Sequence, residues 1–336
     1  TGYIKISSFS KTTHSEFVEA AFVMKEKGMK NLILDLRGNS GGYMDAATNI
    51  VDEFLNGGKL IVYTEGKARP KSSVYSTDKR AVCVDTKLAV LIDEFSASAS
   101  EIVAGAIQDN DRGWIIGRRS FGKGLVQEPT VFNDGSMLRL TTARYYTPSG
   151  RCIQKNYSRG YDSYYDEIME RYLHGEFSEA DSIEFPDSLQ YKTTGGRIVY
   201  GGGGIMADIF IPIDSILFKP ALRAISDYGL AYSFALKYTD KNRPELSKID
   251  NPESLLIYLD RKNILSQFYT YLYQNKVKIP YYQLNSVSQY IKWSVYAYLI
   301  RNVFDDNEYY RYINQMDKSC KVAVEILESE KEILEK

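Results

Sequence analysis

The chain has 336 residues, of which 44% are hydrophobic and 25% are charged, and its formal net charge is −1. This length and composition are ordinary for a globular protein of about two domains. The near-zero charge provides no basic field that would attract nucleic acid or anionic lipid, so both partners are disfavoured. Cys83, Cys152 and Cys320 form no C-x-x-C pair, which indicates neither a disulfide framework nor a zinc site.

The first 150 residues alternate short apolar strands with amphipathic helices, the pattern of a layered α/β domain. Asn133-Asp134-Gly135 predicts a hairpin turn between the last two strands. We expect the elements in this order: strand 3–6, helix 13–27, strand 31–36, helix 44–55, strands 59–63 and 87–93, helix 101–108, and strands 114–117, 125–131 and 136–146.

The composition becomes rich in tyrosine after about residue 150, and residues 155–190 indicate an insertion. Two further strands, at 197–200 and 209–213, are expected to return the chain to the first domain. From about residue 215 the pattern is helical, and we expect its aromatic stripes to form core or interface rather than a cofactor site. The longest helices are predicted over 255–273, 286–304 and 309–335.

The two histidines lie in unpromising places for catalysis. A serine nucleophile needs a neighbouring base, and histidine is the usual one. However, His14 falls in the first turn of a predicted helix, and His174 lies in a polar, tyrosine-rich stretch. A Ser-His-Asp triad is therefore not expected. Lysine can replace histidine as the base where burial lowers its pKa.

Ser96-Ala97-Ser98-Ala99-Ser100-Glu101 follows a predicted strand and opens a predicted helix. A serine at such a turn is exposed, and the first helix amides point at a developing oxyanion. The segment by itself does not indicate which serine matters. It also fits a simpler interpretation, in which the serines only cap the helix.

Phe121-Gly122-Lys123-Gly124 offers a lysine in a glycine turn. Lys123 and Gln127 are four residues apart, a spacing that places both side chains on one face of a strand or helix, so Gln127 could hold the lysine amine. A surface lysine in a glycine turn is the alternative, and the motif lacks the spacing of a phosphate loop.

Residues 35–42, Asp-Leu-Arg-Gly-Asn-Ser-Gly-Gly, leave a predicted strand through glycines that free backbone N–H groups to bind an anion. An oxyanion donor is favoured over a phosphate site because the glycines fit no nucleotide fingerprint. A tight turn would explain the glycines equally well, but it would not explain the preceding Asp-Leu-Arg.

These stretches together resemble the C-terminal-processing peptidases, or tail-specific proteases, a family of serine endopeptidases with a Ser-Lys catalytic pair. The resemblance covers most of residues 1–213. It is carried by residues 34–42, 95–102, 121–127, 134–136, 143–151, 196–197 and 201–208.

The resemblance implies a ClpP/crotonase-like α/β core, with Ser98 as nucleophile, Lys123 as general base and Gln127 positioning the lysine. It also implies an oxyanion hole formed by the backbone N–H of Ala99 and that of Gly41 or Gly42. Two acidic residues receive lesser roles: Asp109 supports the site, and Glu101 favours the helix N-terminus. No metal or cofactor is implied.

The family usually carries a PDZ domain just before the strand that starts at Gly2, and we expect none in this chain. The expected organisation is a peptidase domain over 1–214 and a mainly helical domain over 215–336 that acts as a scaffold or forms homo-oligomers. The implied partners are protein or peptide substrates, with no nucleic acid. By resemblance alone, the implied location is the periplasm or cell envelope of a Gram-negative bacterium.

Two other functions stay open at this level. Relatives of the fold serve as non-catalytic peptide- or lipid-binding modules. A Ser-Lys amidase or esterase acting on small molecules would share the nucleophile but would need a closed pocket.

Overall fold

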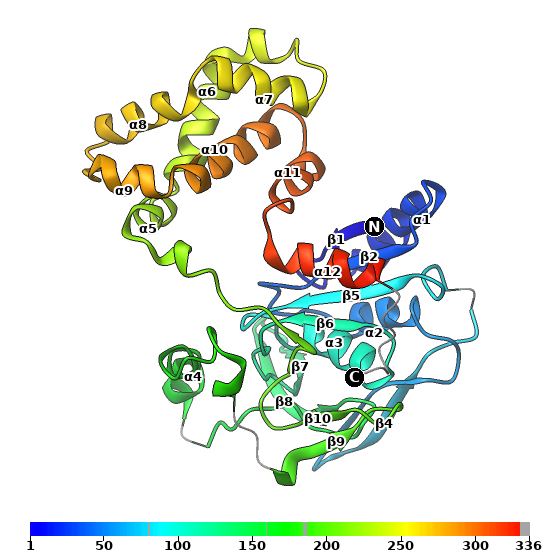
Figure 1. Ribbon diagram of the computed structural model, residues 1–336. Helices are drawn as coiled ribbons and strands as arrows, with labels where there is room; N and C mark the ends of the chain where they lie inside the picture. Colours follow the sequence, from blue (N-terminus) through cyan, green and yellow to red (C-terminus); the bar gives the residue numbers. More distant parts are fainter. Residues whose placement is uncertain (80, 159, 184–186, 330–336) are drawn as a thin grey trace. The chain divides into compact units, whose positions relative to one another are not determined.

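The computed structural model describes residues 1–79, 81–158, 160–183 and 187–329 (Figure 1). The chain divides into two compact units: Thr1–Pro212 with Val322–Lys336, and Ile213–Lys321. The last segment of the chain thus groups with the first unit, whereas the sequence pattern predicts one continuous helical domain over 215–336. The α/β core and the helical C-terminal region of the predicted fold class are confirmed.

A parallel sheet forms the centre of the first unit, in the order β1-β2-β5-β6-β11. Its inner strands are almost continuous runs of Leu, Ile and Val, as expected for strands buried on both faces. The bounds of its strands are β1 Gly2–Lys5, β2 Asn31–Asp35, β5 Lys87–Ile92, β6 Trp114–Gly117 and β11 Ile209–Phe210.

A second, antiparallel sheet has the order β4-β3-β8-β7. Helices α2 and α3 contact β3 of this sheet, and α3 also contacts β6 of the parallel sheet, so the helices lie between the two sheets (Figure 1). Their side chains belong to one buried cluster with residues of both sheets. The bounds are α1 Thr13–Glu26, α2 Met44–Asp52, α3 Ala99–Asp109, β3 Leu60–Gly66, β4 Arg69–Tyr75, β7 Leu125–Val131 and β8 Met137–Tyr146.

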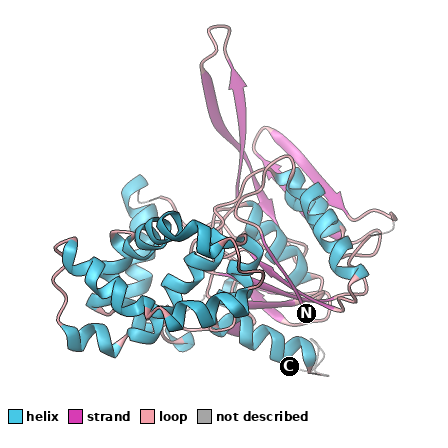
Figure 2. Cartoon of the chain, turned by 90° about the horizontal axis from the view of Figure 1, so that it is seen from above, coloured by secondary structure: helices cyan, strands magenta, loops and turns pink. Residues whose placement is uncertain are grey.

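The β7–β8 hairpin forms as predicted and turns at Gly135, whose φ is +82°. Its far end carries the exposed apolar side chains of Phe132, Met137 and Leu140, and a long hairpin projects from the body in Figure 2. The hairpin's outer strand, β7, is an edge of the sheet, because Arg144–Tyr146 of β8 pair with β3.

The predicted insertion contains the helix α4, Tyr161–Leu173, followed by two short 3-10 helices, Ala180–Ser182 and Asp187–Leu189. A small antiparallel pair, β9 Gln190–Lys192 and β10 Ile198–Tyr200, then leads back to β11.

The second unit is entirely helical in the part of the chain that the structure describes. Helices α6 and α10 contact each other along their lengths, and the rings of Phe234 and Phe268 meet edge to face at 5.2 Å in the core. No helix among the described residues is long and apolar enough to cross a membrane. A 3-10 helix at Ser215–Phe218 precedes α5 Pro220–Asp227, α6 Leu230–Leu246, α7 Pro252–Arg261, α8 Ile264–Gln274, α9 Tyr281–Ser286, α10 Ser288–Val303 and α11 Asp306–Ile313.

Two long helices predicted from the periodicity are each broken in the structure. The helix predicted over 255–273 divides into α7 and α8 because Asn263 adopts a left-handed conformation with φ +52°. The helix predicted over 309–335 divides into α11 and α12, Lys318–Glu328, where the Asp317 carboxylate accepts from the Cys320 N–H and starts a new helix. The end predicted at residue 335 lies outside the described residues.

Leu259 gives a test of the helical core, because its side chain is fully buried whereas Ile257 on the same helix is 55% exposed. Replacing Trp114 with Phe leaves Trp293 of α10 as the sole tryptophan, and its fluorescence then reports on the second unit. In this background we expect Leu259→Ala to lower the free energy of unfolding in urea by about 2–5 kcal/mol. Ile257→Ala should change it by less than about 0.5 kcal/mol. Equal effects would contradict this assignment of the core.

Candidate active site

Ser98 lies at the N-terminal end of α3 in an unusual backbone conformation, with φ +55° and ψ −113°. Such values are rare for a residue with a side chain and recur at functional turns. The hydroxyls of Ser96 and Ser100 are buried and donate to the carbonyls of Leu36 and Asn39, whereas Ser98 is partly exposed. Of the three serines, Ser98 is therefore the one that a substrate can reach.

The carboxylate of Glu101 joins the Ser98 turn to the loop that carries Lys123. Its Oε2 accepts from the backbone N–H groups of Ser98 and Lys123, both at 2.8 Å. Its Oε1 accepts from the Gly122 N–H at 2.7 Å and from the Ser120 hydroxyl at 2.5 Å. One carboxylate thus fixes two chain segments, and its role is wider than the helix-end effect predicted from the sequence.

Glu101 is fully buried. Burial raises the pKa of its carboxyl group above the ordinary value, although the four hydrogen bonds act to lower it. Because Glu101 gathers these donors from residues up to 22 positions away, its position constrains both segments at once.

Tyr145 makes a second bridge between the same segments. Its hydroxyl lies 3.0 Å from the Ser98 carbonyl oxygen and 2.5 Å from that of Lys123. The ring is buried, and this burial raises the pKa of the phenol well above its ordinary value, so the hydroxyl keeps its proton and can donate. Tyr145 comes from β8 and Glu101 from α3, so the two bridges have separate origins.

Lys123 is half-buried just before β7, and its side-chain nitrogen has no hydrogen-bond or ion-pair partner among the described residues. Gln127 is exposed, and the register of β7 against β8 shifts between Val126 and Gln127. Within the described part of the chain no hydrogen bond joins Lys123 to Gln127 or to Ser98. The four-residue spacing therefore does not bring the Gln127 amide to the lysine in this structure.

The glycine turn at 41–42 packs against Ser98. A Cβ atom on Gly41 would lie 2.7 Å from the Ser98 Cβ, so this close approach requires glycine. The Gly41 N–H donates to the side chain of Asn39 at 2.8 Å. By contrast, the N–H groups of Gly42 and Ala99 have no hydrogen-bond partner among the described residues. These two N–H groups are therefore available as backbone donors.

The preceding Asp-Leu-Arg anchors this turn to the parallel sheet. Asp35 is buried and accepts from the Arg37 backbone and guanidinium and from the Tyr3 hydroxyl. Burial acts to raise the pKa of Asp35, but the hydrogen bonds and charge of Arg37 outweigh it and hold the pKa below its ordinary value. Asp35 and Arg37, which a simple tight turn would not require, thus anchor the turn to the sheet.

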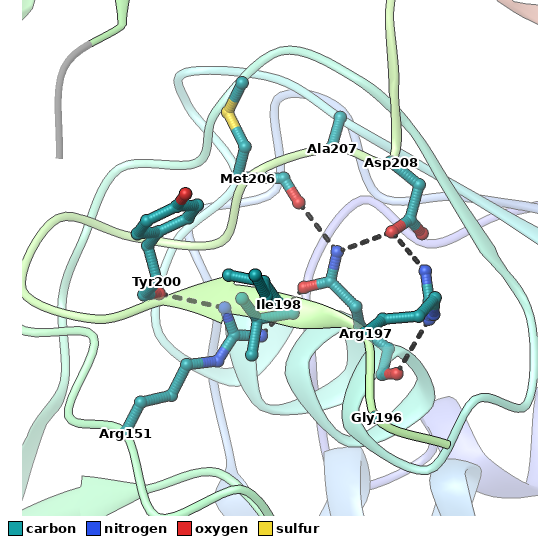
Figure 3. A pocket seen from close by; sticks show the side chains of 10 residues that line it. Arg151, Gly196, Arg197, Ile198, Tyr200, Met206, Ala207 and Asp208 are labelled. Carbon is teal, nitrogen blue, oxygen red and sulfur yellow. Dashed lines mark hydrogen bonds and ion pairs between the residues drawn. The ribbon is translucent and has the colours of Figure 1, made fainter. Parts of the chain in front are cut away.

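Asp109 lies at the other end of α3, where it pairs with the fully buried Arg151 at 2.7 Å and accepts from the Ser149 N–H. Arg151 borders a pocket of about 490 Å³ that Ser98 and Lys123 do not line (Figure 3). The second arginine of this pocket, Arg197, pairs with Asp111 and Asp208. The local positive charges are therefore neutralised, and the pocket is not arranged to hold an anion.

Both histidines are engaged elsewhere, as the sequence suggested. His14 pairs with Glu53 at 2.9 Å, and the His174 ring lies 2.7 Å from the carbonyl oxygen of Glu170. Among the described residues no group of three or more His, Cys, Asp or Glu side chains could hold a metal ion.

Two family models match the chain. Residues 1–160 match "Peptidase family S41", and residues 221–305 match "Family of unknown function (DUF8443)". The resemblance to C-terminal-processing peptidases is thereby confirmed for residues 1–160. The second match covers most of the helical unit and does not indicate an activity.

Several proteins named as carboxyl-terminal-processing enzymes are similar to this chain. Carboxyl-terminal-processing peptidase 3, chloroplastic, of Arabidopsis thaliana is 42% identical over 44% of this chain and 28% of its own length. The carboxyl-terminal-processing protease of Synechocystis is 34% identical over 61% of this chain and 47% of its own. The carboxy-terminal-processing protease of Bartonella bacilliformis is 43% identical over 46% and 36%. The chain therefore spans less than half the length of these relatives.

A solved structure titled photosystem II D1 C-terminal processing protease is 36% identical, with a TM-score of 0.42. It covers 45% of this chain and 39% of the other.

We expect Glu101→Gln to lower the free energy of unfolding of the first unit by about 1–3 kcal/mol, because a glutamine NH₂ group would face N–H donors and leave at least one unpaired. Urea denaturation followed by Trp114 fluorescence, with Trp293 replaced by Phe, measures this. Glu179→Gln, at an exposed glutamate, is the matched control and should have no effect. An unchanged stability in Glu101→Gln would contradict the bridging role.

Proposed function

We propose that this chain, whose residues 1–160 match Peptidase family S41, is a serine endopeptidase that cleaves protein substrates in or near their C-terminal tails. In this proposal Ser98 is the nucleophile and Lys123 is the general base. The observation that carries it is the double bridge, in which Glu101 and Tyr145 each bind both the Ser98 turn and the Lys123 loop. If the serines only capped the helix, the Ser98 turn would not need to be joined to the segment that carries Lys123.

The reaction begins when Ser98 Oγ attacks the carbonyl carbon of the scissile bond and its proton passes to the Lys123 amine. The tetrahedral oxyanion is stabilised by the N–H groups of Ala99 and Gly42. We favour Gly42 over Gly41 because the Gly41 N–H is already bound to Asn39. Lys123 then gives its proton to the departing amine, which leaves an ester between Ser98 and the substrate.

Water completes the cycle by attacking the ester carbonyl while Lys123 removes its proton. The second tetrahedral intermediate collapses, the proton returns to Ser98 Oγ, and the substrate leaves as a carboxylic acid. Asp109 supports this site from the far end of α3 through its pair with Arg151. Gln127 has a role only if the lysine and the amide approach each other when substrate binds.

The substrate is best accommodated as an added strand on β7. This strand is the edge of its sheet, and it begins two residues after Lys123. Extended peptides commonly bind by adding to such an edge, where the backbone supplies the affinity.

The wider organisation is also part of the proposal. The peptidase domain comprises residues 1–214, and the segment from Val322 onward groups with it. The helical residues between these two parts form a scaffold or a surface for homo-oligomers. Of the relatives reported above, one is named as chloroplastic and others are bacterial, and we propose a Gram-negative cell envelope for this chain.

Ser98→Ala and Lys123→Ala in the full-length protein should each lower kcat/KM for an unfolded protein with an apolar C-terminus by about 10⁴-fold or more. Ser72→Ala and Lys67→Ala, at exposed positions on or beside β4, are the matched controls and should retain wild-type cleavage. Fragment analysis by mass spectrometry measures the loss of the tail.

The same assay separates the alternatives. Hydrolysis of a small ester that depends on Ser98, without cleavage of the protein, would indicate an amidase or esterase. A folded wild type that binds the peptide but hydrolyses neither substrate would indicate a binding module.

Strand addition predicts an alternating response to backbone methylation of the substrate. Every second N–H of an added strand faces β7, so N-methylation at those positions should raise KM by about 2- to 10-fold per lost hydrogen bond. Methylation at the intervening positions should leave KM unchanged. A KM that does not alternate along the peptide would count against this binding mode.

A further inference from the structure

The loop from Arg119 to Gly124, which carries Lys123, is held by hydrogen bonds along nearly its whole backbone. The N–H groups of Ser120, Phe121 and Gly124 donate to Ile205 O, Ser96 O and the Gln154 side chain. The N–H groups of Gly122 and Lys123 donate to Glu101, and the carbonyl of Lys123 accepts from the Tyr145 hydroxyl. The carbonyls of Arg119 and Ser120, at the start of the loop, need hydrogen-bond donors from elsewhere in the chain.

Arg171 of α4 supplies that partner. Its Nη2 donates to the Arg119 carbonyl at 2.7 Å, and its Nη1 donates to the Ser120 carbonyl at 3.1 Å. Its Nε donates to Glu176, whose carboxylate also binds the guanidinium of Arg119. Arg171 is only 4% exposed, so these bonds are made out of water, where a charged donor is strong and specific.

A second contact joins α4 to the same loop at Phe121. The ammonium of the buried Lys155 lies 3.9 Å from the centre of the Phe121 ring and 4.5 Å from that of Tyr164 on α4. Its charge is balanced by Glu167 of α4 at 2.6 Å. The Lys155 backbone N–H also donates to the Gly122 carbonyl, one residue before Lys123.

Helix α4 lies beyond the residues that match the peptidase family model, which ends at residue 160. It also precedes residue 221, where the second family model begins. The contacts of α4 with the lysine loop are therefore made by a part of the chain that neither model covers.

We propose that Arg171 is a positioning residue for Lys123: by fixing the Arg119 and Ser120 carbonyls, it holds the base in line with Ser98. The inference rests on the proposed function of Lys123. The inserted helix thereby acts as a brace for the catalytic base, with the Lys155–Glu167 pair as its second support.

Arg171→Met tests this proposal, because methionine fills much of the space but donates no hydrogen bond. A displacement of about 1 Å in a catalytic group can cost on the order of 100-fold in rate, so we expect kcat to fall by at least about tenfold. KM should stay within about threefold, since β7 is unchanged. Arg171→Lys, which keeps a charged donor, should restore part of the lost kcat.

Arg112→Met is the matched control. Arg112 is also a partly buried arginine that donates to backbone carbonyls, those of Phe54, Cys83, Val84 and Thr86, but none belongs to the lysine loop. Both variants should lose stability, yet Arg112→Met should keep wild-type kcat per folded molecule. Equal losses of kcat in both variants, or none in Arg171→Met, would overturn the proposal.

Hydrogen exchange separates this inference from the proposed function, because it requires no activity. We expect faster amide exchange over residues 119–124 in Arg171→Met and not in Arg112→Met. Faster exchange in a protein whose wild type cleaves nothing would support the brace and reject the peptidase. Unchanged exchange, with active wild type and active Arg171→Met, would reject the brace and leave the peptidase standing.

Discussion

The buried carboxylate of Glu101 is the constraint on which the candidate site depends. Removing a carboxylate from water is costly unless hydrogen bonds replace those of the solvent. Glu101 obtains four, from one side chain and three backbone N–H groups. These donors belong to two segments, so the turn and the loop must both be in place before the carboxylate is satisfied. The folding of the nucleophile and of the base loop is thereby linked.

The two proposed catalytic residues are held in place by different layers of the first unit. The Ser98 turn is held by the parallel sheet and the 35–42 segment, with Ala97 N–H donating to the Asn39 carbonyl. The Lys123 loop is held by β8 and by the inserted helix α4. Glu101 and Tyr145 connect these two sets of supports, and Tyr145 places its hydroxyl between two carbonyl oxygens. The geometry between serine and lysine thus depends on how the layers pack.

The sequence predicted the strands and helices of the first unit well where burial is continuous. The sequence does not reveal strand β4, because its polar residues, Arg-Pro-Lys-Ser-Ser, carry no hydrophobic signal and the strand pairs only at the sheet edge. The break at Asn263 was missed because the apolar period continues across it, and a left-handed residue is set by local geometry. The sequence indicates Glu101 only as a residue that favours the start of a helix. Its role as a bridge cannot be predicted, because its carboxylate accepts from N–H groups about 20 residues away. The bridge made by Tyr145 cannot be predicted either, because its hydroxyl contacts carbonyls that are distant in the sequence.

The helical unit, Ile213–Lys321, is inserted within the first unit and does not simply follow it, because Val322–Lys336 returns to the first unit. The chain therefore crosses between the units twice, and the helical unit is tethered at both of its ends. A module tethered at both ends has less conformational freedom than a module on a single linker. The helical unit can therefore be deleted without loss of part of the first unit only as an internal segment, not by truncation of the C-terminus. A stop codon after Pro212 would also remove the Leu327 side chain, which is buried in this structure.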